Sequence, residues 1–227
     1  MKKIVVAIDG NSGCGKSSTA KALAKALKFI YIDTGAMYRA VTLFFIKHQI
    51  DLKNEQAIKE ALKQIDISFK YNATTGNNET YLNGRNVEKE IRKMKVSDLV
   101  SKVSEISQVR SQLVKQQRRL GESKSVVMDG RDIGTVVFPN ADLKIFMTAD
   151  LQVRALRRQK ELMKKNVSVD LEDILENMAS RDRIDSSRKD SPLKKADGAH
   201  EIDTSHLAFD QQVDQILQLI QHEIEPA

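Results

Sequence analysis

Near its start the chain carries Ile4-Val5-Val6-Ala7-Ile8-Asp9-Gly10-Asn11-Ser12-Gly13-Cys14-Gly15-Lys16-Ser17, a short apolar run that leads into a glycine-rich loop. Residues 10–17 fit the complete phosphate-binding pattern G-x-x-x-x-G-K-[ST]. In such a loop the glycines let backbone N–H groups turn toward a β-phosphate, the lysine reaches the β and γ oxygens, and the serine hydroxyl faces Mg²⁺. The predicted phosphate-binding residues are Gly10, Asn11, Ser12, Gly13, Cys14, Gly15, Lys16, Ser17 and Ser18.

The flanking sequence supports this interpretation over a chance glycine-rich turn. Ile4–Ile8 is short and β-branched, as in a buried parallel strand, and Ala20, Leu23 and Leu27 follow at helical spacing. A dinucleotide-binding turn is the weaker competitor, because the three glycines miss the G-x-G-x-x-G spacing and the Lys-Ser pair has no role in it. The sequence therefore predicts a strand, a phosphate loop and a helix in succession.

The composition indicates one domain over residues 1–227. No signal peptide and no run of about 18 apolar residues is evident, so we expect a soluble cytoplasmic protein without a membrane partner. A single cysteine, Cys14, excludes an intrachain disulfide and zinc sites built on paired cysteines, and the four histidines lack ligand spacing. Cys14 is interpreted as a small loop residue.

The net charge of +6 and the pI near 9.3 suggest either a nucleic-acid surface or a site that neutralises several phosphates. No long basic run occurs, and few aromatic residues interleave with the charges. Arginines instead recur beside glycines and aspartates, at Arg39, Arg131, Arg181 and Arg188. This distribution favours a small anionic ligand over nucleic acid.

Short apolar runs alternate with helical patterns along the chain, as in an α/β fold with a parallel sheet. The predicted strands are Ile4–Ile8, Phe29–Ile32, Val126–Met128, Leu143–Met147 and, less surely, His200–Ile202. Apolar stripes predict a helix after Gly35, a helix through Val96–Ile106, and a closing helix through Val213–Ile224.

Two segments depart from this alternation. Residues 65–95 contain alternating Ile67, Phe69 and Tyr71, a turn at Gly76-Asn77-Asn78 and a hairpin signal at Asn83-Gly84, which together predict a small antiparallel insert. The second segment, Lys160–Val169, is polar and rich in lysine. It is either a mobile lid, for which we take residues 155–169, or an exposed connection between two helices.

Polar segments follow the predicted strands, where parallel α/β proteins bind ligands. Asp129 ends a buried strand and is therefore a candidate partner of Mg²⁺, directly or through water. The arginines of these segments suit a phosphate acceptor, because the planar guanidinium donates two hydrogen bonds at once. Ser101 lies between these segments, with Arg110 two to three helical turns farther on.

These segments carry a resemblance that covers essentially the whole chain in collinear order. Beside the phosphate loop, Thr-Gly-Ala-Met-Tyr-Arg at 34–39, Asp-Gly-Arg-Asp-Ile-Gly-Thr-Val-Val-Phe-Pro at 129–139 and Arg-Asp-x-x-Asp-x-x-Arg at 181–188 are similar to the bacterial cytidylate kinases. The resemblance implies a P-loop nucleoside monophosphate kinase fold: a five-stranded parallel sheet flanked by helices, a monophosphate-binding insert at 65–95 and a lid. It also implies a monomer that transfers a phosphoryl group from ATP to CMP or dCMP.

The family motifs imply a role for each matching residue. Ser101, Arg110 and Asp132 would read the cytosine edge, and Arg181 and Asp185 would face the sugar. Arg39, Arg131 and Arg188, with Thr34 and Tyr38, would hold the acceptor phosphate, and Asp129 would lie beside it. The phosphate loop with Arg154, Arg157 and Arg158 would bind ATP. The implied catalytic residues are Lys16, Arg131, Asp129 and Arg157, with Mg²⁺ on Ser17 and, through water, Asp129.

Two positions depart from the family pattern. Thr34 replaces a frequent serine and keeps the hydroxyl, whereas Ile184 stands where some members carry arginine and so removes one contact to phosphate or lid.

Several of these residues also have a plainer interpretation. Arg157 with Glu161, and Arg181 with Asp185, share the i,i+4 spacing of exposed helix pairs worth roughly 0.3–0.5 kcal/mol. Asp132 is also suited to cap a helix or to pair with Arg131. Another small acceptor, such as UMP, AMP or a metabolite hydroxyl, remains an alternative substrate, and a hydroxyl would need a base such as Asp33 or Asp132.

Overall fold

The computed structural model describes residues 3–74, 77–122, 125–164 and 166–223. It divides into two compact units: Met1–Tyr31 with Leu120–Ala227, and Ile32–Arg119. Gly76 of the predicted turn and Ile224 of the predicted last helix lie outside the described residues. None of the described helices is long and apolar enough to cross a membrane.

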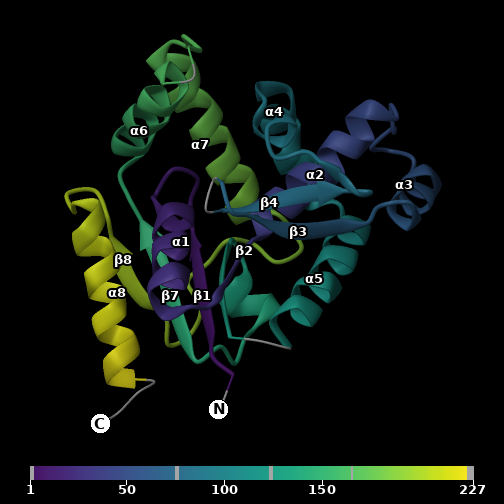
Figure 1. Cartoon of the computed structure of the whole chain (residues 1–227). Helices are drawn as coiled ribbons and strands as arrows, with labels where there is room; N and C mark the ends of the chain where they lie inside the picture. The colour runs from purple at the N-terminus through teal and green to yellow at the C-terminus, as the bar shows by residue number, and fades with distance from the viewer. Residues whose placement is uncertain (1–2, 75–76, 123–124, 165, 224–227) are drawn as a thin grey trace. The chain divides into compact units, whose positions relative to one another are not determined.

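The main sheet has five strands, in the order β2-β6-β1-β7-β8 (Figure 1). The strands are β1 (Val5–Gly10), β2 (Ile30–Asp33), β6 (Val126–Gly130), β7 (Leu143–Thr148) and β8 (His200–Asp203). β1 pairs in parallel with β6 and β7, and β7 pairs in parallel with β8. All five predicted strands are thus confirmed, and their carboxyl ends bring Gly10, Gly130 and Asp203 to one edge of the sheet.

Apolar side chains on one face of this sheet form the main core. Val6, Ile8 and Ile145 belong to one buried cluster with Leu23 of α1 (Lys16–Leu27) and Ile216 of α8 (Phe209–Glu223). Successive residues of a strand face opposite sides, and Ala7 and Met128 are fully buried as well. Burial on both faces explains why these strands read as continuous apolar runs.

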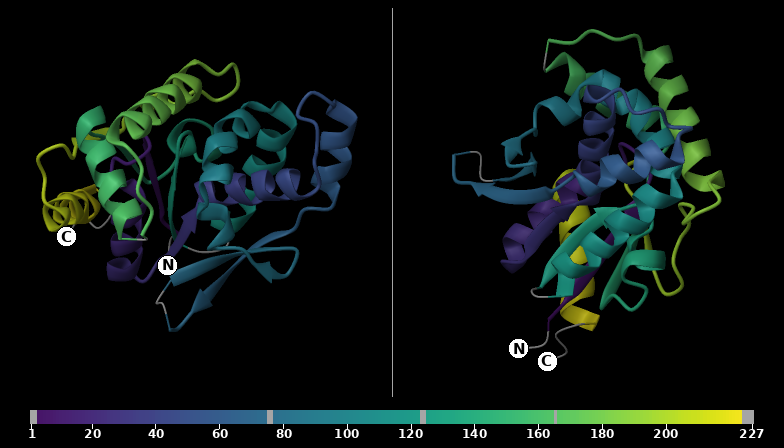
Figure 2. Two further views of the ribbon diagram at one scale, coloured as in Figure 1. Left: turned by 90° about the horizontal axis from the view of Figure 1, so that it is seen from above. Right: turned by 90° about the vertical axis from the view of Figure 1, so that its right-hand side faces the viewer.

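Two helices of the first unit form a hairpin, which lies between β7 and β8 in the sequence. α6 (Leu151–Met163) and α7 (Leu171–Ser187) run side by side in Figures 1 and 2 and share a small core of Ala155, Leu162, Ile174 and Met178. The described residues between them, including Val167, are mostly exposed. The polar interval predicted as a lid or a connection therefore joins these helices at the surface.

The second unit contains the predicted antiparallel insert. β3 (Ile67–Asn72), β4 (Asn77–Leu82) and β5 (Arg85–Asn86) form a three-stranded sheet, in which β3 and β5 pair antiparallel with β4. Asn83 and Gly84 both have positive φ, of 49° and 77°, as the predicted two-residue hairpin turn requires. The remaining elements are α2 (Thr34–Lys47), α3 (Glu55–Lys63), the 3₁₀ turn η1 (Glu90–Arg92), α4 (Met94–Glu105) and α5 (Ser107–Glu122), whose end crosses into the first unit.

The predicted helix through Val96–Ile106 is confirmed as α4, but it does not continue to Arg110. The placement of Arg110 two to three helical turns after Ser101 implies one continuous helix, whereas α4 ends at Glu105 and α5 starts at Ser107. Ile106 between them is extended, with φ −71° and ψ 114°, and its N–H donates to Val103 O. No glycine or proline marks this break in the sequence.

Candidate active site

The loop between β1 and α1 has the backbone that the glycine pattern predicts. The φ values are 154° at Gly10, 79° at Gly13 and 94° at Gly15, and residues other than glycine rarely adopt such values. A Cβ on Gly10 would lie 2.1 Å from Met147 O of β7, so the loop leaves the sheet in direct contact with the neighbouring strand. Cys14 is fully buried, which confirms it as a packed loop residue, whereas Ser18 is exposed on α1.

The side chain of Lys16 bends back over this loop. Its ammonium donates to Asn11 O at 3.0 Å, and the residue is 7% exposed. Burial lowers the pKa of Lys16, and the nearby Arg131 guanidinium lowers it further. A buried cation beside a second cation is stabilised by an anionic ligand, as a phosphate loop requires.

Ser17 and Asp129 are in direct contact, although 112 residues separate them. Ser17 Oγ donates to Asp129 Oδ2 at 2.6 Å, and the hydroxyl of Tyr31 donates to Oδ1 of the same carboxylate at 2.8 Å. The parallel pairing of β1 with β6 sets Ile8 beside Asp129 and so brings the two ends together. The predicted pair of Mg²⁺ candidates therefore forms one cluster of oxygen atoms.

Asp9, the residue before the loop, is a site residue that the sequence argument missed. Its carboxylate accepts hydrogen bonds from Ile133 N and Gly134 N, both at 2.8 Å. Burial raises the pKa of Asp9 to about 7, against the lowering effect of those two hydrogen bonds. The signal in the sequence was an acidic residue inside an otherwise apolar buried strand.

A second cluster in the same unit joins the segment after β6 to the end of α7. Arg131 Nε donates to Asp185 Oδ2 at 2.8 Å, and Arg188 Nη1 lies 3.6 Å from Asp185 Oδ1. Burial opposes the charge on Asp185, but the Arg131 guanidinium outweighs it and holds the pKa of that carboxyl below its usual value. The observed ion pair is thus Arg131 with Asp185. The sequence had suggested Arg181 as the partner of Asp185, and Asp132 as a partner of Arg131.

Arg181 adds a further cation to this cluster. Burial and the neighbouring Arg131 lower its pKa to about 10, and its Nε is buried without a hydrogen-bond partner among the described residues. Asp132 also belongs here, with its Oδ1 4.0 Å from Arg188 Nη2. The cluster holds three arginines against two aspartates, which suits an anionic ligand.

The arginines of α6 have defined partners. Arg154 donates to Ala149 O at 2.8 Å and Ser12 O at 3.2 Å and pairs with Asp182 at 2.7 Å, so it braces the phosphate loop. Arg157 donates to the backbone oxygen of Thr204 at 2.6 Å and to its Oγ1 at 3.1 Å.

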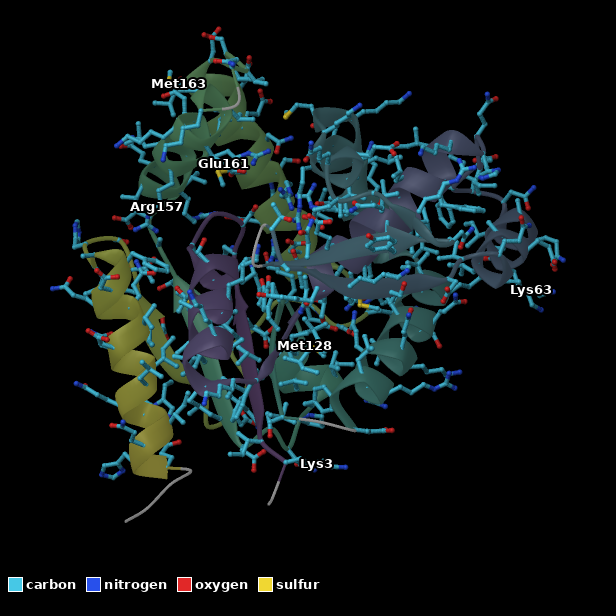
Figure 3. The ribbon with its side chains drawn as sticks, in the orientation of Figure 1. Lys3, Lys63, Met128, Arg157, Glu161 and Met163 are labelled. Carbon is cyan, nitrogen blue, oxygen red and sulfur yellow. The ribbon has the colours of Figure 1, made fainter. Side chains whose placement is uncertain are left out.

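The pairing of Arg157 with Glu161 is wrong, because Glu161 pairs with Arg158 at 2.8 Å. Figure 3 labels Arg157 and Glu161 at separate places on the hairpin of α6 and α7. Thr204 is another residue that the sequence argument missed. It is fully buried, and its hydroxyl lies 2.9 Å from Cys14 O in the phosphate loop.

The second unit holds the remaining predicted residues, around the start of α2. Asp33 caps this helix by accepting from Ala36 N at 2.8 Å, and it pairs with Arg92 at 2.8 Å. Burial opposes the charge of Asp33, but Arg92 outweighs it and lowers the pKa, so Asp33 is a poor general base. Arg92 was not singled out from the sequence.

Farther along α2, Arg39 donates to Ser97 Oγ of α4 at 2.8 Å and to Ile91 O at 3.3 Å. Thr34 and Ser101 are buried. The Arg110 guanidinium lies 5.4 Å from the centre of the Tyr38 ring and donates to Ser104 O at 3.1 Å. The sequence motif at 34–39 and the residues Ser101 and Arg110 thus share one compact unit.

Comparison with known proteins places the whole chain in one family. A family model described as cytidylate kinase matches residues 6–222. The cytidylate kinase of Cytophaga hutchinsonii is 57% identical over 219 residues, which cover 96% of this chain and 94% of that protein. The cytidylate kinase of Flavobacterium johnsoniae is 55% identical over 223 residues, covering 97% of each.

A solved structure confirms the general fold. An uncharacterised protein from Eubacterium ventriosum superposes with a TM-score of 0.52 at 15% identity, covering 97% of this chain and 99% of that one. A sequence identity this low shows only that the two folds are similar. By contrast, the family model and two cytidylate kinases that are more than 50% identical match this chain over nearly its full length. The chain therefore belongs to the cytidylate kinase family.

Proposed function

We propose that this chain transfers the γ-phosphoryl group of ATP to CMP or dCMP and so forms ADP and CDP or dCDP. The observation that carries the proposal is the family match over residues 6–222. The contact of Ser17 with Asp129, at the mouth of a phosphate loop with the expected backbone, supports it independently.

The donor side consists of residues of the first unit. Gly10, Asn11, Ser12, Gly13, Cys14 and Gly15 offer backbone N–H groups to the phosphates, Ser17 and Ser18 lie at the start of α1, and Lys16 neutralises the β and γ oxygens. Arg154, Arg157 and Arg158 of α6 are proposed to face ATP. Because Arg154 and Arg157 donate to Ser12 O and to Thr204, we assign them also the task of holding the loop in place.

The acceptor residues are assigned from the family motifs. Arg131, Arg188 and Arg39, with Thr34 and Tyr38, are assigned to the phosphate of CMP. Arg181 and Asp185 are assigned to the sugar, and Ser101, Arg110 and Asp132 to the cytosine edge. The three arginines around Asp185 in the first unit agree with this assignment, because they leave positive charge for a phosphate to balance.

The residues present also fit Mg²⁺. The ion prefers hard oxygen ligands and keeps several waters, so a hydroxyl and a carboxylate 2.6 Å apart are suitable partners. No cluster of three or more acidic, histidine or cysteine residues that could hold a metal occurs in the described part of the chain. When bound, Mg²⁺ would balance charge on the β and γ oxygens.

The chemistry demands positioning more than proton transfer. The attacking group is a phosphate oxygen, which is ionised at neutral pH, so no general base is needed. Lys16 and Arg131 supply positive charge where negative charge spreads in the transition state, and Asp185 holds Arg131 in orientation. The segment 65–95 is proposed as the monophosphate-binding insert and 155–169 as a lid that excludes water. We further propose a monomeric cytoplasmic enzyme.

The test is ADP release from ATP and Mg²⁺, measured without acceptor and with CMP, dCMP, UMP, AMP or GMP. We expect strong ADP formation with CMP and dCMP and little with the others. Strong release with UMP or AMP would reassign the acceptor. ADP formed equally without any acceptor would replace the proposal with a simple ATPase or a nucleotide switch.

A further inference from the structure

Asp9 lies where two functional segments of the first unit meet. It is the penultimate residue of β1, directly before the phosphate loop, and is 3% exposed. Its Oδ1 accepts from Ile133 N and its Oδ2 from Gly134 N, each at 2.8 Å. Both donors belong to the first turn of the π-helical segment η2 (Ile133–Val137).

This arrangement is a helix cap provided from a distant strand. The first N–H groups of a helix lack partners within the helix and are usually satisfied by the residue just before it. Asp132 occupies that position and is a residue type that often caps, yet its side chain makes no capping hydrogen bond. Asp9 takes that task, and the carboxylate of Asp132 lies instead near Arg188, at 4.0 Å.

Hydrogen bonds of the first turn of η2 therefore fix the backbone of Asp132. Its carbonyl accepts from Val136 N at 2.9 Å and from Val137 N at 3.2 Å, and the next two N–H groups along the chain are those bound by Asp9. A shift in the first turn of η2 would move the Asp132 side chain with it.

We propose that Asp9 is a positioning residue: by capping η2 from β1, it fixes where the Asp132 carboxylate stands and thereby sets the affinity for the acceptor base. The inference rests on the proposed function, in which Asp132 reads the cytosine edge. Asp9 itself touches neither substrate in this account.

The variant Asp9→Asn tests the cap with little change in shape. The amide oxygen accepts one of the two N–H groups, but the NH₂ group faces the other and leaves it without an acceptor. A neutral side chain is tolerable at this position, since burial already raises the pKa of Asp9 to about 7. We expect a melting temperature lower by about 3–8 °C.

The kinetic readout separates positioning from general support of the fold. We expect Asp9→Asn to raise KM for CMP by roughly five- to tenfold and to change KM for ATP less than about twofold. In an Asp132→Ala background the same change should add less than about twofold to KM for CMP, because the group that Asp9 positions is gone. Equal increases for both substrates, or an undiminished effect without Asp132, would overturn the proposal.

Asp142→Asn is the matched control. Asp142 Oδ2 accepts from Val5 N at 2.9 Å, at the other end of the same strand, and an asparagine can keep this hydrogen bond through its amide oxygen. We expect no change in either KM. A rise in KM for CMP in this variant would show that any change around β1 disturbs the acceptor site, and it would also overturn the proposal.

A second variant covers the case that Asp9→Asn does not fold. In Gly134→Ala the new Cβ would lie 3.3 Å from Ala196 Cβ, which is tight, and 3.4 Å from Asp9 Oδ2, so the first turn of η2 or Ala196 must give by a few tenths of an ångström beside the cap. We expect roughly a two- to threefold rise in KM for CMP alone, and an unchanged KM would count against the inference. Failure of the proposed function looks different, because the wild-type chain itself would then form ADP without responding to CMP or dCMP.

Discussion

Arg131 donates from Nε to Asp185 Oδ2 at 2.8 Å, and this contact joins the strand end of β6 to the last turns of α7. The two side chains are 17% and 6% exposed. Burial disfavours the charged form of both side chains, but the opposite charge of the partner favours it. The pKa of Arg131 is therefore raised and the pKa of Asp185 is lowered. Removing one partner of such a pair leaves the other charge buried and unpaired.

Asp185→Asn is therefore expected to destabilise the fold strongly. It removes the carboxylate that faces Arg131, Arg188 and Arg181 and should lower the free energy of unfolding by about 3–5 kcal/mol. Urea unfolding measures this loss. The control is Glu161→Gln, which breaks the more exposed pair with Arg158 and should cost less than about 0.5 kcal/mol. Similar losses in the two variants would contradict the role given to Asp185.

Lys16→Ala should remove catalysis without unfolding the chain. We expect kcat to fall by at least about a hundred- to a thousandfold, because the lysine supplies charge where the transferred phosphoryl group is stabilised. Circular dichroism checks the fold, and coupled ADP release checks the rate. Lys25→Ala, an exposed lysine of the same helix α1, should keep kcat within about twofold. Unchanged turnover in a folded Lys16→Ala protein would refute the assignment of the phosphate loop.

Gly10→Ala should be much more harmful than Gly84→Ala. Both glycines have positive φ, of 154° and 77°, but only at Gly10 would a Cβ meet backbone, 2.1 Å from Met147 O. Strain alone should cost Gly84→Ala about 1–2 kcal/mol, and Gly10→Ala should lose at least about 3 kcal/mol, since β7 must move. Thermal unfolding of the two variants tests the difference, and equal costs would show that β7 does not constrain the loop.

Thr204→Val should destabilise the phosphate loop by removing a buried hydrogen bond to its backbone. The Thr204 hydroxyl lies 2.9 Å from Cys14 O and accepts from Arg157 Nη1 at 3.1 Å, at a fully buried position. Valine keeps the shape and leaves these groups unsatisfied, so we expect a loss of about 1–3 kcal/mol and a rise in KM for ATP. Thr42→Val, also fully buried but bonded only within α2 to Tyr38 O as far as the described contacts show, should leave KM for ATP unchanged. An equal effect of the two substitutions would remove Thr204 from the donor site.

The pH dependence of stability should reveal the buried Asp9 carboxyl. Its pKa is about 7 in the folded chain, against an ordinary value of 3.8, so the folded state holds the proton more tightly between these two pH values. The stability that this proton provides is fully present below pH 3.8 and is lost as the pH rises through about 7. The free energy of unfolding of the wild type, relative to Asp9→Asn, should fall by about 4 kcal/mol across that window. Parallel pH profiles of the two proteins would contradict the raised pKa.

The sequence by itself determined the local structures of this protein: its strands, one hairpin turn and the phosphate loop. Apolar runs predicted the five strands of the parallel sheet, Asn83-Gly84 predicted the hairpin turn, and residues 10–17 predicted the phosphate loop, because each depends on neighbours within a few positions. The break at Ile106 escaped prediction because no glycine or proline marks the end of α4 in the sequence.

Only the tertiary structure decided which partners the charged residues take. Arg157 contacts Thr204 rather than Glu161, Asp185 pairs with Arg131 rather than Arg181, and Asp9 caps a helix that starts 124 residues later. A charged side chain can satisfy its hydrogen bonds equally well with several candidates of the same type, so spacing along the chain cannot choose among them. For Asp9 the parallel register of β1 with β6 makes the choice, because it pairs Asp9 with Gly130, three residues before Ile133.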